Sequence, residues 1–519
     1  ANDATATIAD VLDTLRAHVL HGRGVSAATK AEFFNGFVLE QLVKLYDAPE
    51  PCPDLVHTFL EDLVASITAG AAVGGESSDA LVAPAAAATA ADGKADGERK
   101  SAGAAAAAAA AQLWKHHRGT MLRLLSRLKA NEDARQQTLV LRVLAAFPRL
   151  VSAYLRQMPY AFEPRPSMRW LANVSLLGKV FELPVRAAFL PSAAAAHLPH
   201  YRAPVAVLLE HLSPPSLTQS ALSHGLQHAS TLVRYATMNL LCLVFRRYGE
   251  LRERALSRLS GAGSGGGKDE AQLADAQFRE ALRKRVPDAQ VVYQLRAVIE
   301  RLTSAESKAK SSKKGKAKSG GDAMDDVDEA KERKSAAASA AASTSLDGSG
   351  EDVVLDDRDG ELKLNRSPAE TRDLMFSRLL ELLTCYQAQL PEAMLESRID
   401  LWKLLSPPEQ CAQLSPLCQH NLIALLRALG PTSPRLWQLV KQAPSKADAK
   451  DAKASKAAVV TAAGAPATHF GVLLQLMVAA ADHSAEQSAA AGGSVREQAR
   501  AFLLEALQST RVKIGRAHV

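Results

Sequence analysis

The chain has 519 residues, with 62 Lys and Arg against 55 Asp and Glu, which gives a formal net charge of +7. This length exceeds what one compact core holds, so it predicts several domains or an extended repeat array. The small positive charge permits contact with nucleic acid without requiring it. An aromatic content of 5% argues against a surface dominated by base stacking. The chain starts at Ala1 rather than Met, which indicates that the true start is missing.

Cysteine and hydropathy patterns exclude several protein classes. The five cysteines are scattered and form no CxxC pair, a pattern that fits a reducing compartment and argues against a disulfide framework or a zinc finger. Apart from polyalanine, no apolar run reaches the length of about 18 residues that a membrane span needs. No secretory signal opens the chain. We therefore expect no membrane contact and no secretion.

Apolar residues recur at helical spacing along most of the chain. Ile8, Leu12, Leu15 and Val19 share one face, and the same spacing returns repeatedly. Alternating strand patterns of useful length are absent. These features predict an all-α protein, a degenerate HEAT/armadillo-like α-solenoid with long disordered low-complexity inserts. The predicted helical stretches are 8–20, 31–46, 54–67, 113–128, 132–146, 167–182, 203–212, 216–228, 231–248, 271–302, 370–389, 395–405, 415–429, 468–482 and 496–509.

Composition shifts divide the chain into helical and low-complexity segments. Segments that lack large apolar side chains cannot offset the entropy cost of ordering, so we predict that they are disordered. The last seven residues, KIGRAHV, resemble a translated sequencing adapter, and we interpret them as an assembly artefact. The predicted helical segments are 1–69, 112–303 (with a loop at 260–270), 367–442 and 467–512; the inserts are the Ala/Gly-rich 70–111, the charged 304–366 and the Lys/Ala-rich 443–466; the artefact is 513–519.

The stretch LSHGLQHASTLVRYATMNLLCLVFRR (222–247) has the pattern of two helices joined by a tight break. Ala229 and Ser230 form the break, and Ala236 is small enough to let neighbouring helices approach closely. This is close to the second half of a HEAT-like repeat. His224 and His228 are four residues apart and could share a metal ion, but the five-residue stretch HGLQH lacks the glutamate of HExxH. An architectural role is the better interpretation.

Other candidate chemistry fails on residue type or spacing. GAGSGGGKD (261–269) has Ala262 where a phosphate-binding loop needs glycine and Asp269 where it needs Ser or Thr, so it predicts a flexible linker. The adjacent pair His116 and His117 points in two directions on a helix. His197 and His200, three residues apart, have no acidic or Cys partner nearby. We predict no catalytic residue, no metal, no cofactor and no small-molecule substrate.

The stretch YLRQMPYAFEPRPSMRWLANVSLLGKVFELP (154–184) is the most distinctive in the chain. Its prolines frame one helix, for which Ser167 is the predicted N-cap. Such a segment is typical of an irregular corner between helical repeats. Arg165 and Arg169 are expected on its surface.

Two motifs resemble one known family. FEPRPSMRWLANVSLLGKVFELP and LSHGLQHASTLVRYATMNLL together are similar to the N-terminal region of the nucleolar pre-ribosomal-associated protein 1 family, and FFNGFVLEQLVKLY and ESRIDLWKLL are compatible with that order. The resemblance covers about residues 8–250 well and 370–440 loosely. It implies an α-solenoid scaffold in the nucleolus that acts on early precursors of the large ribosomal subunit. It also implies pre-ribosomal RNA and assembly factors, including a DEAD-box RNA helicase, as partners. The resemblance assigns no catalytic residue to this chain.

The basic run at 308–318 is followed by an acidic cluster at 325–329 and indicates nuclear targeting or salt-sensitive contact with RNA phosphates. The alternative to a pre-60S scaffold is a generic HEAT-like adaptor, in transport or signalling, that binds proteins only. A third hypothesis is an enzyme with an unrecognised site, which no motif supports. The predicted RNA or partner contacts are Arg165, Arg169, Arg234, Arg246, Arg247, Lys313, Lys314 and Lys316.

Overall fold

A computed structural model describes much of the predicted helical sequence and little of the low-complexity sequence. The predicted segments 70–111, 304–366, 443–466, 467–512 and 513–519 therefore lie wholly or largely outside the described residues, and of the predicted loop 260–270 the residues 262–266 lie outside them. Two compact units are present, unit 1 with residues 1–221 and 246–285 and unit 2 with residues 222–245 and 286–519. The described residues are 5–22, 24–25, 27–72, 118–148, 150–185, 209–261, 267–301, 353–355, 362–364, 367–405, 414–430, 497, 500–502 and 504–505.

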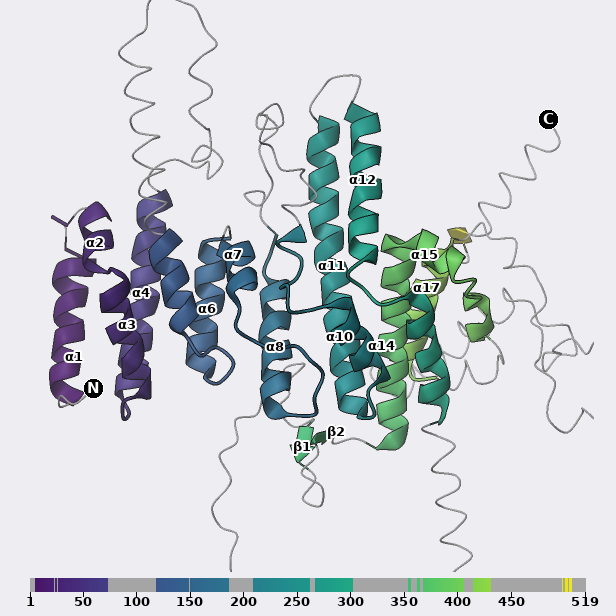
Figure 1. Ribbon diagram of the computed structural model, residues 1–519, viewed down its shortest axis with the longest axis horizontal. Coiled ribbons are helices and arrows are strands. Elements are labelled where there is room, and N and C mark those ends of the chain that lie inside the picture. The colour runs from purple at the N-terminus through teal and green to yellow at the C-terminus, as the bar shows by residue number, and fades with distance from the viewer. Residues whose placement is uncertain are drawn as a thin grey trace, which may run out of the picture. The chain divides into compact units, whose positions relative to one another are not determined.

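Unit 1 is built from helices that contact one another in chain order. Helix α1 packs against α4, α4 against α6, and α6 against α8, and Figure 1 shows them following each other from purple to blue. Helices α10 (Gln219–Gln227) and α11 (Thr231–Gly261) contribute residues to both units. The remaining elements of unit 1 are α1 (Thr5–Thr14), the π-helix η1 (Leu15–Leu20), α2 (Ala27–Phe33), α3 (Gly36–Lys44), the 3-10 helix η2 (Leu45–Asp47), α4 (Cys52–Ala72), a helix at 118–127, α6 (Ala134–Ala146), α7 (Leu150–Gln157), α8 (Met168–Glu182) and α12 (Gly267–Arg283).

Side-chain caps set where several of these helices begin. The Asn35 side chain accepts hydrogen bonds from the first amides of α3, and Asp133 does the same for α6. Ser167 caps α8 by accepting from the Trp170 amide, which confirms the N-cap predicted from the sequence. Each cap satisfies backbone N–H groups that have no partner inside the helix, an effect worth about 1 kcal/mol.

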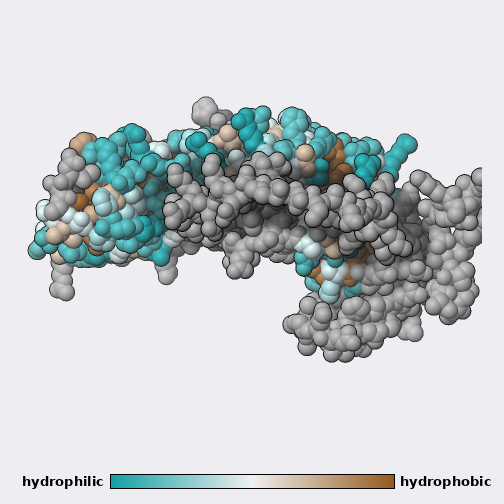
Figure 2. Space-filling model, turned by 90° about the horizontal axis from the view of Figure 1, so that it is seen from below, coloured by the Kyte–Doolittle hydropathy of each residue, from teal (hydrophilic) through white to brown (hydrophobic). Residues whose placement is uncertain are grey.

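Apolar side chains between the helices form the core of unit 1. Leu60 of α4, Leu139 of α6 and Leu177 of α8 are all 0% exposed. Burying one such side chain contributes roughly 1.5–3 kcal/mol. At the edge of the α4–α6 contact, Arg142 lies 2.8 Å from Glu61 in an ion pair. Figure 2 shows one face of the molecule, on which the coloured surface is mainly hydrophilic with small hydrophobic areas.

Unit 2 is centred on the contact between α14 and α17. Asn421 of α17 donates hydrogen bonds to the carbonyl and the hydroxyl of Ser377 on α14. The Tyr386 ring lies 4.6 Å from the Phe245 ring, centroid to centroid, and its hydroxyl donates to the Pro287 carbonyl at 2.8 Å. Besides its parts of α10 and α11, unit 2 contains a helix at 289–301, strands β1 (Val353–Leu355) and β2 (Leu362–Leu364), α14 (Pro368–Gln389), α15 (Pro391–Glu396), the 3-10 helix η7 (Leu401–Leu405) and α17 (Pro416–Leu429).

The described fold is predominantly helical, in agreement with the predicted class, but several predicted helices differ. The stretch 31–46 is divided between α2 and α3, and 395–405 contains the end of α15 and the 3-10 helix η7. The single helix predicted over 271–302 is wrong, because α12 ends at Arg283 and a second helix begins at residue 289. Pro287 lies between them, and proline removes a backbone donor and disfavours helical geometry in the residue before it. Helix α11 also continues to Gly261 instead of ending near residue 248.

Two short strands lie inside the segment 304–366, for which the composition predicts disorder. Strands β1 and β2 pair antiparallel, with Val353 opposite Leu364 and Leu355 opposite Leu362. The all-α class still holds, and this hairpin of two three-residue strands is a local departure from the disorder predicted for the segment. The sequence holds the signal, since a β-branched apolar run is separated from a second apolar run by Asp359 and Gly360, a typical hairpin turn pair.

Gly225 lets α10 approach α11 closely within unit 2. A Cβ at this position would overlap the Thr237 hydroxyl and lie 2.9 Å from its methyl carbon, and Thr237 is only 2% exposed. We therefore expect Gly225→Ala to lower the free energy of unfolding by about 1–3 kcal/mol, the usual cost of overpacking. Urea titration of the wild-type and variant chains measures this difference in the free energy of unfolding.

Gly119 provides the matched control, since a Cβ added to it would meet nothing within 4 Å and it sits in a helix. Gly119→Ala is expected to be neutral or stabilising by up to about 1 kcal/mol. Equal losses in the two variants would show that close helix packing at Gly225 is unimportant.

Candidate interaction surface

Arg165 and Arg169 are both exposed, as expected, at the proline corner before α8. Arg165 lies 3.2 Å from Glu163 in an exposed ion pair, which partly offsets its charge. Two side chains of α8 hold the corner in place through hydrogen bonds to its backbone. The Trp170 indole donates to the Phe162 carbonyl at 3.3 Å, and the Asn173 amide donates to the Ala161 carbonyl at 3.2 Å. The two arginines thus lie on a segment that is held by one buried and one partly buried hydrogen bond.

The three arginines predicted on α11 lie in different environments. Arg246 is exposed and belongs to unit 1. Arg234 belongs to unit 2 and is half-buried; burial lowers the pKa of its guanidinium. Its Nε is buried and makes no hydrogen bond to the described residues. Proximity in sequence therefore does not place these side chains on one surface.

The predicted RNA or partner contact at Arg247 is wrong. The side chain is 1% exposed and cannot reach RNA from this position. Its Nη1 donates to the carbonyls of Val180, Phe181 and Leu183, each at 3.2 Å, and its Nε donates to the His211 carbonyl at 3.0 Å. The first carbonyls belong to the last turn of α8, where no intrahelical donor remains. Burial lowers the pKa of Arg247 to about 10, so the side chain is still a cation near neutral pH. It serves as the C-terminal cap of α8.

Arg285 has a similar structural role, for which no sequence pattern provides a reason. Its Nη1 donates to the Leu209 carbonyl at 2.9 Å and to the Ser213 hydroxyl at 3.0 Å. Burial lowers the pKa of this guanidinium too. Together Arg247 and Arg285 anchor the segment 209–213. Lys313, Lys314 and Lys316 lie outside the described residues.

One chain of polar groups in unit 1 has the outline of a catalytic relay. The Tyr46 hydroxyl is 3.0 Å from His57 Nδ1, and His57 Nε2 is 3.2 Å from Glu61, which also pairs with Arg142. Tyr46 is only 8% exposed, and burial raises the pKa of its hydroxyl. A buried, weakly acidic phenol is a poor nucleophile, and the groups tie η2, α4 and α6 together. We interpret the chain as structural.

Of the histidine pairs singled out from the sequence, only His224 and His228 lie among the described residues. The His228 ring accepts a hydrogen bond from the Ser230 amide at 3.0 Å, so it shapes the turn before α11. His116, His117, His197 and His200 lie outside the residues whose placement is described. Within the described residues, no cluster of three or more His, Cys, Asp or Glu could hold a metal ion. The glycine-rich segment 261–269 runs from the end of α11 into the start of α12, without the preceding strand that a phosphate loop requires.

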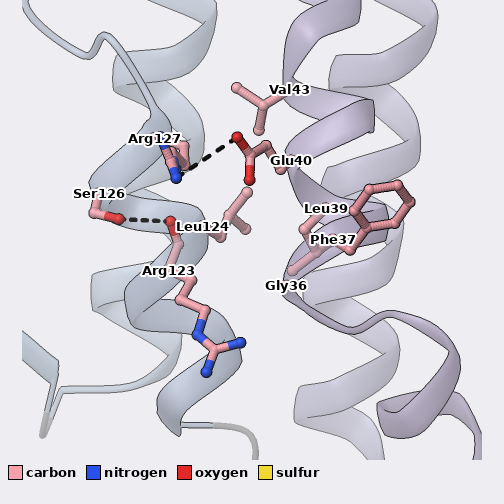
Figure 3. Close-up of a pocket in the computed structure, with 9 residues that line it drawn as sticks. All are labelled: Gly36, Phe37, Leu39, Glu40, Val43, Arg123, Leu124, Ser126 and Arg127. Atoms are coloured by element: carbon pink, nitrogen blue, oxygen red, sulfur yellow. Dashed lines mark hydrogen bonds and ion pairs between the residues drawn. The ribbon is translucent and has the colours of Figure 1, made fainter.

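A groove runs between α3 and the helix at 118–127, both in unit 1 (Figure 3). Its volume is about 550 Å³. Leu39 and Leu124 close the floor and are each 1% exposed. On the α3 side, Phe37 is 71% exposed and Val43 is half-buried. The groove therefore has an apolar floor and one apolar rim.

Charged side chains form the rest of the rim. Arg127 lies 3.6 Å from Glu40 across the groove, with side chains 59% and 37% exposed, and Figure 3 shows this pair bridging the two helices. Arg123 is exposed one turn away. A Cβ at Gly36 would lie 2.8 Å from Arg123 Nη1, so the guanidinium rests over the bare backbone of Gly36. The two arginines and one glutamate leave this rim positively charged.

Among the described residues, no helix is long and apolar enough to cross a membrane.

His211 makes unit 1 sensitive to acid. The side chain is 5% exposed, and burial together with Arg247 and Arg156 lowers its pKa from 6.5 to about 4. In the unfolded chain His211 therefore binds a proton near pH 6.5, whereas in the folded chain it binds one only near pH 4. The free energy of unfolding falls as the pH falls through this window. From pH 7 to pH 5 we expect a loss of about 2 kcal/mol from this group.

Urea titrations at both pH values measure this loss, and His211→Gln should remove it. The exposed His21 supplies a control, because His21→Gln should leave the pH dependence of the wild-type chain unchanged. An identical pH dependence in wild type and His211→Gln would contradict the assignment.

Comparison with known proteins connects this helical chain with ribosome assembly. Residues 1–173 match the family model Npa1, described as Ribosome 60S biogenesis N-terminal. The chain is 23% identical over 477 residues to nucleolar pre-ribosomal-associated protein 1 of Homo sapiens and equally to that of Mus musculus. These alignments cover 85% of this chain and 17% of each relative, so the chain spans a small part of their length. No solved structure matches it significantly. The resemblance predicted from the sequence is confirmed: residues 1–173 match the Ribosome 60S biogenesis N-terminal family model, and most of the chain is similar to nucleolar pre-ribosomal-associated protein 1.

Proposed function

We propose that this chain is a non-catalytic nucleolar scaffold in the early assembly of the pre-60S ribosomal particle. The observation that carries the proposal is the match of residues 1–173 to the 60S biogenesis family, supported by relatives named as nucleolar and pre-ribosomal. Pre-ribosomal RNA and large-subunit assembly factors, among them a DEAD-box RNA helicase, are the proposed partners.

The helical architecture supports a scaffold. In unit 1 the successive contacts of α1, α4, α6 and α8 support the proposed HEAT/armadillo-like α-solenoid, in which each helix pair buries its apolar face on the next. Such stacking leaves a continuous outer surface that can hold several partners at once. The polar relay at Tyr46 is accounted for by packing, and the matched family is named for ribosome biogenesis; both support a role without chemistry.

Affinity purification of the tagged chain tests the function. We expect pre-ribosomal RNA and large-subunit assembly factors to co-purify, and the RNA to crosslink directly to the chain under ultraviolet light. Recovery of soluble protein partners alone, with ribosomal RNA at background, would favour the generic HEAT-like adaptor and reject the scaffold of pre-60S particles.

The proline corner supplies a sharper prediction for RNA contact. Reversing both exposed charges, Arg165→Glu with Arg169→Glu, should weaken binding of a pre-ribosomal RNA fragment several-fold. The slope of log affinity against log salt should fall in magnitude by about 1–2, because two phosphate contacts are removed. Filter binding over a salt series measures both quantities.

The matched control reverses two exposed cations elsewhere on unit 1, Arg254→Glu with Lys284→Glu. It makes the same change in net charge. We expect a small decrease with little change in slope. Equal decreases in the two double variants would show that only the overall charge matters, and that Arg165 and Arg169 do not contact RNA.

A further inference from the structure

We propose that the groove between α3 and the helix at 118–127 is a docking site for an amphipathic segment of a partner protein. The segment packs an apolar side chain against Phe37 and Val43 and places a carboxylate on Arg123. This inference rests on the proposed scaffold function and names one surface through which the scaffold holds an assembly factor.

The apolar part of the groove fits a protein side chain. Phe37 is 71% exposed although it stands on a helix whose other face is buried through Leu39 and Leu42. An exposed phenylalanine beside a groove of about 550 Å³ has the size and chemistry of a binding hot spot, since aromatic side chains bury much area and lose little entropy. Leu39 and Leu124 give the incoming side chain a closed floor.

Charge complementarity selects an acidic segment. Arg127 already has a carboxylate partner in Glu40, 3.6 Å away across the groove. Arg123 has no carboxylate partner among the described residues, and its guanidinium lies over Gly36. A carboxylate arriving there would form a charge-assisted hydrogen bond with an arginine already held at the groove. The excess of one positive charge on the rim matches one Asp or Glu of the partner.

The same features disfavour RNA as the occupant. Glu40 stands inside the groove, half-buried and opposite Arg127, where it would repel a phosphodiester. Among the described residues that line the groove, Phe37 supplies the single aromatic ring, so a base has no second ring there against which to stack. An amphipathic helix with an apolar residue one turn from a carboxylate could pack the apolar side chain on the floor of the groove and pair the carboxylate with Arg123 on the rim.

Site-specific photo-crosslinking in the full-length tagged chain tests the proposal. Phe37→benzoylphenylalanine places the crosslinker at the groove without disturbing the core, and Leu273→benzoylphenylalanine on α12, at a residue 62% exposed, is the matched control. Mass spectrometry should identify one peptide of another protein that crosslinks from position 37 and not from 273. That peptide should carry an apolar residue within one helical turn of Asp or Glu.

Point variants then test the role of the charge. A synthetic peptide with the crosslinked sequence should bind the Arg123→Glu chain at least tenfold more weakly. Gly36→Ala should weaken binding several-fold, because the new methyl group pushes the Arg123 guanidinium aside. Gly119→Ala on the facing helix should bind as the wild type does. Fluorescence anisotropy measures all four affinities.

Several outcomes would overturn the docking site. These are crosslinks from position 37 to RNA alone, to a second copy of the chain, or to the chain's own residues, and crosslinking no stronger than from position 273. If Phe37→benzoylphenylalanine lowers the melting temperature, Arg127→benzoylphenylalanine probes the opposite rim under the same criteria.

The co-purified material separates this inference from the proposed function. If pre-ribosomal RNA co-purifies while position 37 gives no protein crosslink, the docking site is rejected and the scaffold function stands. If position 37 captures a peptide of the expected kind in a complex without pre-ribosomal material, the docking site stands and the pre-60S assignment is rejected.

Discussion

The guanidinium of Arg247, buried where helix α8 ends, is the interaction on which this part of unit 1 depends. It donates to three carbonyls at the end of α8 and to the carbonyl of His211, so it joins α8, the segment 209–213 and α11. The ring of Phe181 lies beneath it, 5.8 Å from centroid to guanidinium. Loss of the side chain would leave several buried carbonyls without donors, at about 1–3 kcal/mol for each unsatisfied group. A helix end inside a protein requires such a partner.

Much of the helical fold could be predicted from local spacing, because apolar periodicity and caps act within one helix. Ser167 and the break before Thr231 are of this kind. The burial of Arg247 also has a local signal: Leu240, Val244, Arg247 and Leu251 continue one stripe at spacings of four, three and four, and all are buried. A positive charge at the end of a helix suggests a surface feature, whereas the stripe places this one in the core.

Other features depend on contacts that local spacing does not encode. Gly225 matters because Thr237 of the next helix lies against it, and a glycine in a helical pattern does not name its neighbour. The groove joins α3 to a helix more than 70 residues later, across the insert predicted at 70–111. Residue types alone could not place Arg123 against Gly36 or Arg127 opposite Glu40. The hairpin at β1 and β2 escapes prediction for a different reason, because the composition of its surroundings outweighs a short pairing signal.

The positions of the arginines determine what the basic charge of the chain can do. Arg247 and Arg285 donate to internal carbonyls, so their charge stabilises the fold and cannot reach a partner. Arg165 has a neighbouring carboxylate in Glu163 and remains exposed. Arg123 alone among these four rests on the exposed rim of the groove, over Gly36, and has no carboxylate of its own within the described residues. A net charge of +7 therefore says less about partners than the few exposed cations whose hydrogen-bonding capacity the fold leaves unused.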